Sequence, residues 1–253
     1  MCLILVAWKV HPDYPLIVAA NRDEFFARPS AAAAAWPEAP MVHGGRDLEA
    51  GGTWLAVTSG GRFAAVTNVR EAQAQQGLRS RGFLTRDFLL GDSTAADYVR
   101  QLETTEMQSF AGFNLLVSDG DELCYLSNRG GMATRLTPGI YGVSNHLLDT
   151  PWPKLESAKR RFSAALSYPD QASPFFALLA DDEIVPDSHL PATGVPLAWE
   201  RLLSAVFVRS PEYGTRASTL LRMRQDRSST LIERNFAADG LLLEEIELLI
   251  PGR

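Results

Sequence analysis

The 253-residue sequence predicts an α+β protein in which antiparallel sheets are layered with helices. Apolar strand segments follow one another across short turns, which is the pattern of antiparallel hairpins. The helical segments come in two blocks between these hairpins and do not alternate with single strands. We therefore expect two antiparallel sheets packed face to face, with helices outside both. One domain over 1–253 is expected, because one core supports up to roughly 250 residues.

The strands begin at the N-terminus. Cys2 to Val10 and Leu16 to Ala20 are apolar runs on either side of turn residues, so the chain is expected to open with a hairpin whose first strand lies in an inner sheet. Ala31 to Ala35 is a low-complexity run near proline and is expected to be a loop. The other expected strands are Gly51 to Val57, Phe63 to Thr67, Asn114 to Val117, Leu123 to Leu126, Ala133 to Leu136, Ile140 to Val143, Ala217 to Met223 and Thr230 to Phe236.

The helices are predicted from apolar periodicity. Leu155, Ala158, Phe162 and Leu166 recur at steps of three and four, which places them on one stripe of a helix. Gln73 to Gly82 is polar and basic and is expected to be a mobile loop and a candidate lid. The expected helices are Thr85 to Leu90, Ala95 to Leu102, Leu155 to Leu166, Phe175 to Leu179 and Trp199 to Val208.

Composition and charge exclude several function classes. The net charge is −6 and the basic residues are scattered, so no nucleic acid partner is expected. No apolar run reaches the roughly 18 residues of a membrane span, and the start of the chain lacks the features of a signal peptide. A cytoplasmic location is therefore expected. The four histidines lie far apart and no paired-cysteine motif exists, so no metal or other cofactor is expected.

The two cysteines lie in different surroundings. Cys124 falls in an apolar strand and is expected to be a buried structural thiol without a function. Cys2 follows the initiator methionine and, taken alone, also fits an ordinary apolar strand residue. However, the second strand ends in the polar run Asn21 to Glu24, and in a hairpin of this length that end lies near the first strand's beginning. Arg22 and Asp23 are therefore expected close to Cys2.

This arrangement fits amide cleavage by an N-terminal cysteine. Such chemistry needs a thiolate, a base and donors for the developing oxyanion. Removal of Met1 would free the α-amino group of Cys2, whose pKa of about 7.7–8.0 suits a general base. Arg22 is expected to hold the pKa of the Cys2 thiol below its free value of about 8.5. Asp23 is expected to orient the ammonium group.

An ordered series of motifs runs along the chain. The motifs are Asn21-Arg22-Asp23-Glu24 after a second-position cysteine, Gly51-Gly52-Thr53-Trp54, Tyr141-Gly142-Val143-Ser144-Asn145, Thr150-Pro151-Trp152 and Tyr213-Gly214-Thr215-Arg216. This series resembles the NRDE family, also named the transport and Golgi organisation 2 family. That family is similar to cysteine N-terminal-nucleophile (Ntn) hydrolases such as penicillin V acylase and bile salt hydrolase, which implies a four-layer αββα sandwich.

The resemblance implies a set of catalytic residues. Cys2 falls where the hydrolases have their nucleophile, and Arg22 and Asp23 resemble the Arg and Asp that flank it. In the hydrolases these two residues are spaced differently, whereas here they are adjacent. Asn68 and Asn145 resemble the two asparagines of the oxyanion hole.

Three further assignments accompany these. Arg216 resembles a late active-site arginine, although an ordinary surface ion-pair partner is the alternative. Asn68 and Asn145 close strands and also fit plain turn residues. Gly44 to Asp47 resembles another family motif, and we expect it in a loop at the pocket edge.

The leading functional hypothesis is a hydrolase of the amide bond of a small N-acyl or related compound. The alternative is a non-catalytic carrier or chaperone of haem or of a lipid or acyl-CoA, which the family resemblance also implies. A structural interaction module explains the clustered polar residues least well. In the first two cases we expect a mostly apolar pocket with a few polar groups at its floor.

Overall fold

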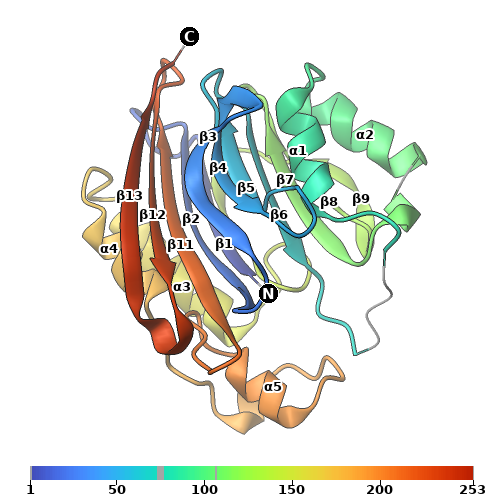
Figure 1. Cartoon of the computed structure of the whole chain (residues 1–253), viewed down its shortest axis with the longest axis vertical. Helices are drawn as coiled ribbons and strands as arrows, with labels where there is room; N and C mark the ends of the chain where they lie inside the picture. The colour runs from blue at the N-terminus through green and yellow to red at the C-terminus, as the bar shows by residue number, and fades with distance from the viewer. Residues whose placement is uncertain (1, 73–76, 106, 253) are drawn as a thin grey trace.

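In the computed structural model, residues 2–72, 77–105 and 107–252 are described, and they form two antiparallel sheets stacked face to face (Figure 1). The six-stranded sheet has the order β10 (Gly139–Val143), β1 (Cys2–Trp8), β2 (Leu16–Phe25), β11 (Tyr213–Met223), β12 (Ser229–Phe236) and β13 (Leu242–Ile250). The seven-stranded sheet runs in chain order through β3 (Ser30–Trp36), β4 (Ala39–Asp47), β5 (Leu55–Thr58), β6 (Phe63–Asn68), β7 (Phe113–Ser118), β8 (Leu123–Ser127) and β9 (Gly130–Arg135).

Helices cover both outer faces of this pair of sheets. α1 (Gly82–Leu90) and α2 (Ala95–Thr105) pack on the seven-stranded sheet, and α3 (Pro153–Ala165) and α4 (Ser173–Leu179) pack on the six-stranded one (Figure 1). The predicted α+β, four-layer αββα arrangement is therefore confirmed. In the described ranges, no helix has both the length and the apolar character that a bilayer span requires. The remaining elements are α5 (Leu197–Leu202) and short 3₁₀ turns at Met107–Ser109, Asp187–His189 and Ala238–Gly240.

Strand β1 is buried on both faces. Successive strand residues point to opposite sides of a sheet, so Ile4 and Val6 pack between the two sheets, whereas Leu3 and Leu5 pack against α3 and α4. Neighbouring strands also flank β1 on both edges, with β10 on one side and β2 on the other. A fixed, central strand thus carries Cys2 at its first position.

Two sequence-based expectations for single elements are wrong. Ala31 to Ala35 is not a loop but most of β3, where Ala33 packs into the core between the sheets. Alanine has weak strand propensity, and the uniform run hides the alternation that marks a strand. The helix expected over Trp199 to Val208 ends at Leu202, because the following residues run beside β11 and bond to it.

Two further differences concern the sheets. The last strand of the expected meander, β10, pairs with β1 in the other sheet instead of with its predecessor β9. Strand β13 is absent from the sequence-based prediction, since both of its faces are largely exposed and its apolar residues do not alternate with polar ones.

Candidate active site

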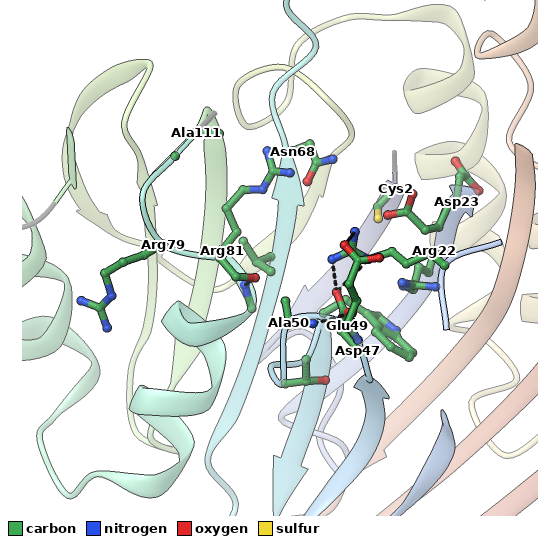
Figure 2. Close-up of a pocket in the computed structure, with 18 residues that line it drawn as sticks. Cys2, Arg22, Asp23, Asp47, Glu49, Ala50, Asn68, Arg79, Arg81 and Ala111 are labelled. Carbon is green, nitrogen blue, oxygen red and sulfur yellow. Dashed lines mark hydrogen bonds and ion pairs between the residues drawn. The ribbon is translucent and has the colours of Figure 1, made fainter. Parts of the chain in front are cut away.

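A cavity of about 560 Å³ opens where β1 begins (Figure 2). Its wall comes from segments that are distant in the sequence: the start of β1, the ends of β2 and β6, the connection after β4, and residues 77–82 before α1. Of the residues that the sequence singles out as catalytic, four line the cavity, namely Cys2, Arg22, Asp23 and Asn68.

The lining is dominated by charge, so the expectation of a mostly apolar pocket is wrong. The cavity lies at the ends of strands, where the chain leaves the core and the sequence turns polar. Eight of the eighteen lining residues are charged: Arg22, Asp23, Glu24, Arg28, Asp47, Glu49, Arg79 and Arg81.

Cys2 and Arg22 lie directly opposite each other in the register of β1 and β2. Directly paired residues present their side chains to the same face of a sheet, here the face that packs on the other sheet. Arg22 is only 6% exposed, and its guanidinium lies over the ring of Trp54 at 4.3 Å. Among the described residues, its Nη1 has no hydrogen-bond partner.

The expected lowering of the Cys2 pKa does not occur in the unprocessed chain. Burial raises the pKa of the Cys2 thiol, and the negative charge of Asp23 raises it further. The positive charges of the chain's N-terminus and of Arg22 act in the opposite direction, but the loss of solvent around the thiol outweighs both.

Asp23 is held from β11. The Thr215 hydroxyl donates to Asp23 Oδ1 at 2.7 Å and accepts from the backbone N–H of Val208 at 2.9 Å. The Tyr213 hydroxyl donates to the Asp23 backbone oxygen at 3.1 Å. Because the carboxyl is 2% exposed, burial raises its pKa, while nearby Lys154 and the Thr215 bond oppose that rise.

Lys154 is a buried cation that the sequence analysis missed. It is 6% exposed and donates to the carbonyl oxygens of Leu203 (2.8 Å) and Ala205 (3.4 Å). Burial lowers its pKa to about 8, and the Asp23 carboxylate limits the fall. A lysine in the first turn of an amphipathic helix usually faces solvent, so the sequence carries no signal for its burial.

The two asparagines occupy different places. Asn68 ends β6 and lines the cavity, half-buried. Asn145 is fully buried and does not line the cavity; its Nδ2 donates to the backbone oxygen of Asn68 at 3.0 Å. The Ser144 hydroxyl donates to the Cys2 carbonyl at 3.1 Å. The two residues that follow β10 thus connect the strand that carries Cys2 to Asn68.

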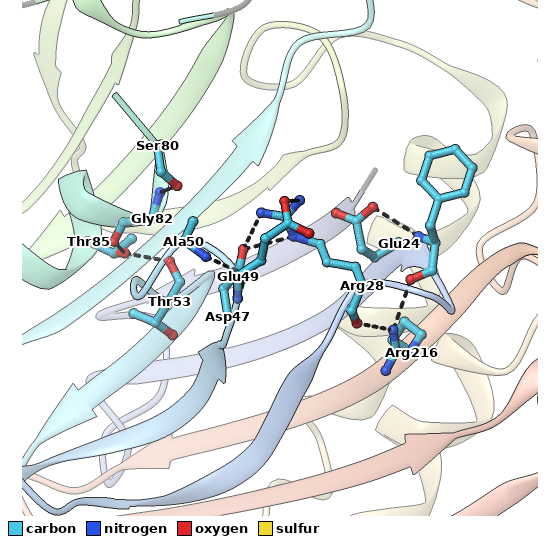
Figure 3. A network of polar contacts seen from close by, with 11 residues as sticks. Glu24, Arg28, Asp47, Glu49, Ala50, Thr53, Ser80, Gly82, Thr85 and Arg216 are labelled. Carbon is cyan, nitrogen blue, oxygen red and sulfur yellow. Dashed lines mark hydrogen bonds and ion pairs between the residues drawn. The ribbon is translucent and has the colours of Figure 1, made fainter. Parts of the chain in front are cut away.

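Arg216 does not line the cavity. It lies at a register shift between β11 and β2, and such bulges redirect side chains. Its Nη1 donates to the carbonyl oxygens of Phe25 (2.9 Å) and Arg28 (2.9 Å), as Figure 3 shows. Arg216 thereby fixes the turn after β2. Arg28 follows that turn and pairs with Asp47 in the cavity wall at 2.8 Å.

The motif Gly44 to Asp47 is the end of β4, not a loop, although Asp47 does lie in the cavity wall. Close packing explains why position 45 is a glycine: a Cβ on Gly45 would lie 2.2 Å from the ring of Trp54, over which the Arg22 guanidinium lies. The glycine therefore leaves room for the aromatic ring that supports this cation.

A second close approach brings α1 to the cavity. A Cβ on Gly52 would lie 2.4 Å from the carbonyl carbon of Gly82, so only glycine fits where the two backbones meet. The Thr85 hydroxyl donates to the Thr53 carbonyl at 2.6 Å and holds the first turn of α1 there (Figure 3).

Arg81, just before α1, is another cavity residue that the sequence analysis missed. In Figure 2 its side chain extends toward Asn68, and its Nη1 donates to the carbonyl oxygen of Gly112 at 3.1 Å. The expected mobile loop, 73–82, is only partly described: 73–76 lie outside the described residues. The Arg79 N–H donates to the Ser109 carbonyl at 3.0 Å, so the described part is anchored.

The arrangement brings together a thiol, a guanidinium without an ion pair among the described residues, a buried carboxyl and an amide side chain. The thiol and the amide N–H donor are groups that acyl transfer to a cysteine uses, together with a base. In the part of the chain that the structure describes, no group of three or more His, Cys, Asp or Glu side chains is placed to hold a metal ion.

Comparisons with known proteins agree with the motif resemblance. The transport and Golgi organization protein 2 homologs of Bos taurus and Homo sapiens are 38% and 37% identical to this chain, and each match covers 93% of both proteins. In fold, the chain is similar to a Caenorhabditis elegans N-acylethanolamine-hydrolyzing acid amidase ortholog, an Ntn hydrolase (TM-score 0.52, 13% identity, 87% of this chain and 92% of that one). The model of the family described as transport and Golgi organisation 2 matches residues 1–238. The chain therefore belongs to the transport and Golgi organisation 2 family.

Proposed function

We propose that this chain, once Met1 is removed, is an N-terminal-cysteine hydrolase that cleaves the amide bond of a small N-acyl compound. The observation that carries the proposal is the placement of Cys2. It starts a strand buried on both faces, and its thiol shares a 560 Å³ cavity with Arg22, Asp23 and Asn68. These residues come from three strands, and a merely structural cysteine would not need them.

In the proposed mechanism, the freed α-amino group of Cys2 takes the proton of the thiol. The thiolate attacks the substrate's carbonyl carbon, and Asn68 donates to the resulting oxyanion. The amine leaves with the proton from the α-ammonium group, and a thioester remains on Cys2. Water then hydrolyses the thioester, which releases the carboxylic acid and restores the thiol.

The other charged groups set the state of the nucleophile. In the unprocessed chain, burial raises the pKa of the Cys2 thiol, and the charge of the N-terminus lowers it by less. In the processed chain the α-ammonium group belongs to Cys2 itself, so its charge lies closer to the thiol and favours the thiolate more strongly. Asp23, fixed by Thr215, orients that ammonium group. Removal of Met1 is therefore the activating step in this proposal.

Asn145 and Arg216 act as positioning residues in this proposal. Asn145 holds the backbone of Asn68, and Arg216 holds the turn after β2. Neither is assigned a contact with the substrate.

The amide class of the substrate is supported by the structural neighbour, which is described as hydrolysing N-acylethanolamines. The rival function is a non-catalytic carrier of haem or of a lipid or acyl-CoA. The charged lining does not suit a purely apolar ligand, so such a carrier would have to bind its ligand through an anionic group. A carrier would bind its ligand whether or not Cys2 and Met1 processing are intact. The experiment therefore asks whether activity depends on Cys2 and on the removal of Met1.

The test compares processed protein, verified by intact mass, with its Cys2→Ala, Cys2→Ser and Cys124→Ala variants on a panel of N-acyl amides. We expect no turnover with Cys2→Ala, at most a trace with Cys2→Ser, and retained turnover with Cys124→Ala. Cys124 is 1% exposed in a separate core, so its variant controls for the loss of a thiol. Unimpaired turnover by Cys2→Ala would end the proposal.

A further inference from the structure

We propose that the cavity binds an anionic substrate, a small amide with a carboxylate close to its scissile bond, and that Arg81 at the start of α1 binds the carboxylate. The inference rests on the proposed hydrolase function and narrows its substrate class. It starts from two guanidinium groups in the cavity, those of Arg22 and Arg81, which form no ion pair within the described residues.

Arg81 is fixed where it can meet a ligand. It precedes the first residue of α1 and lines the cavity, and its bond to the Gly112 carbonyl holds one end of the guanidinium. Burial lowers the pKa of Arg81, so its positive charge is only partly solvated. A bound carboxylate would compensate this charge.

The N-terminus of α1 adds a second source of positive potential. Ser80 and Gly82 also line the cavity, and the first turn of α1 contains no acidic residue. Its first N–H groups are bonded to the Ser80 hydroxyl, the Ser80 carbonyl and the Arg81 carbonyl, so this helix end acts on an anion through its dipole. The close contact of Gly52 with Gly82 fixes this helix end at the cavity.

Arg22 is the independent observation that points to a ligand. Its side chain lies in the interior, since the residue is only 6% exposed, and its Nη1 has no hydrogen-bond partner in the described ranges. A buried charge without a partner is costly. The ring of Trp54 covers one face of the guanidinium but cannot accept all its donors.

The acidic residues of the wall interact with other groups. Arg28 forms ion pairs with Asp47 and Glu49, each at 2.8 Å. Asp23 accepts from Thr215, and Glu24 accepts from the backbone N–H of the next residue at 2.9 Å. Asp23 acts on Arg22, and Glu24 on Arg81, only through charge at a distance. No ion pair to either arginine is formed within the described residues, so their N–H groups remain available for an anion from the substrate.

The carboxylate could come from either side of the amide. In an N-acyl amino acid it lies on the amine side, and in a monoamide of a dicarboxylic acid it lies on the acyl side. The shared chemistry is one carboxylate within a few bonds of the scissile carbonyl, so the experiment includes both kinds of probe.

The test measures equilibrium binding to Cys2→Ala protein by calorimetry, because this variant cannot form the thioester. The probes are N-hexanoylglycine, its neutral counterpart N-hexanoylglycinamide, and N-pentylsuccinamate. We expect at least one carboxylate probe to bind about 10- to 100-fold more tightly than the neutral amide, as a charge-assisted hydrogen bond allows. Arg81→Met in the same background should remove this preference, and Arg81→Lys should restore part of it.

Arg79→Met is the matched control. Arg79 lines the same cavity, but it pairs with Asp87 at 3.2 Å and its side chain is directed away from Cys2 in Figure 2. Its variant should keep the preference for carboxylate. Equal affinity for all three probes, or a preference that survives Arg81→Met, would overturn the inference. A preference that depends on Arg81, together with no turnover by processed native protein, would uphold the anion site and count against the hydrolase.

Discussion

Lys154 gives a quantitative test of the electrostatics behind the cavity. Burial lowers its pKa from the ordinary 10.5 to about 8. Between these two pH values the unfolded chain holds a proton that the folded chain has released, so the free energy of unfolding should rise with pH. The pKa difference of about 2.5 corresponds to about 3 kcal/mol over the whole window. The destabilisation by the buried ammonium charge is largest below pH 8 and disappears above pH 10.5, where Lys154 is neutral in both states.

The assay is urea unfolding at several pH values from 7.5 to 10.5 for native protein, Lys154→Met and Lys159→Met. Native protein should gain about 3 kcal/mol across the window relative to Lys154→Met. Lys159 is the control, because it lies on the same helix but forms a surface pair with Asp149. Its variant should follow the pH dependence of native protein.

The quantity to compare is the slope of the free energy of unfolding against pH, and not its value at one pH. Lys154→Met also removes the hydrogen bonds to Leu203 and Ala205, and that loss shifts its stability at every pH. Groups whose charges do not act on Lys154 titrate alike in all three proteins and cancel in the difference. Parallel pH profiles for native protein and Lys154→Met would refute the reasoning.

Three further predictions test packing and thiol access. Gly52→Ala should destabilise the protein by about 1–3 kcal/mol, since its Cβ would meet the backbone at the start of α1; a thermal melt at native level would contradict this. Arg70→Met should cost about 3–5 kcal/mol in urea unfolding, because it leaves the carboxylate of Glu200, now bonded at 2.6 Å, buried without its cation; a loss under 1 kcal/mol would be inconsistent with a buried pair. Iodoacetamide should modify Cys2 before Cys124, which is 1% exposed and whose pKa burial raises to about 11; peptide mapping that finds Cys124 modified first would show that the cavity does not admit the reagent.

The parts of the fold that the sequence predicts are those with local signals. The first hairpin follows from two apolar runs around a turn, and it alone is enough to place Cys2 opposite Arg22. The stripe from Leu155 to Phe162 packs against the six-stranded sheet as its periodicity indicates. By contrast, the pairing of β10 with β1 is non-local, and no pattern within β10 specifies its partner.

The residues of the candidate site also separate into those with a local sequence signal and those placed by non-local packing. Residues next to a motif, such as Arg22 and Asp23, are found from the sequence, as is Asn68 at a strand end. Arg81 and Lys154 are not, since their burial depends on where other segments pack. Arg216 carries the motif but not the expected position, because a bulge in β11 turns it toward the backbone after β2.

The adjacency of Arg22 and Asp23 has a simple structural consequence. Neighbouring strand residues point to opposite faces, so Arg22 shares the face of the Cys2 thiol, whereas Asp23 is bonded to Thr215 and lies within reach of the charge of Lys154. The two side chains therefore lie on opposite sides of β2. In the proposed mechanism, Arg22 serves the thiol or a substrate anion beside it. Asp23 serves the cation at the start of β1, which the α-ammonium group supplies once Met1 is removed.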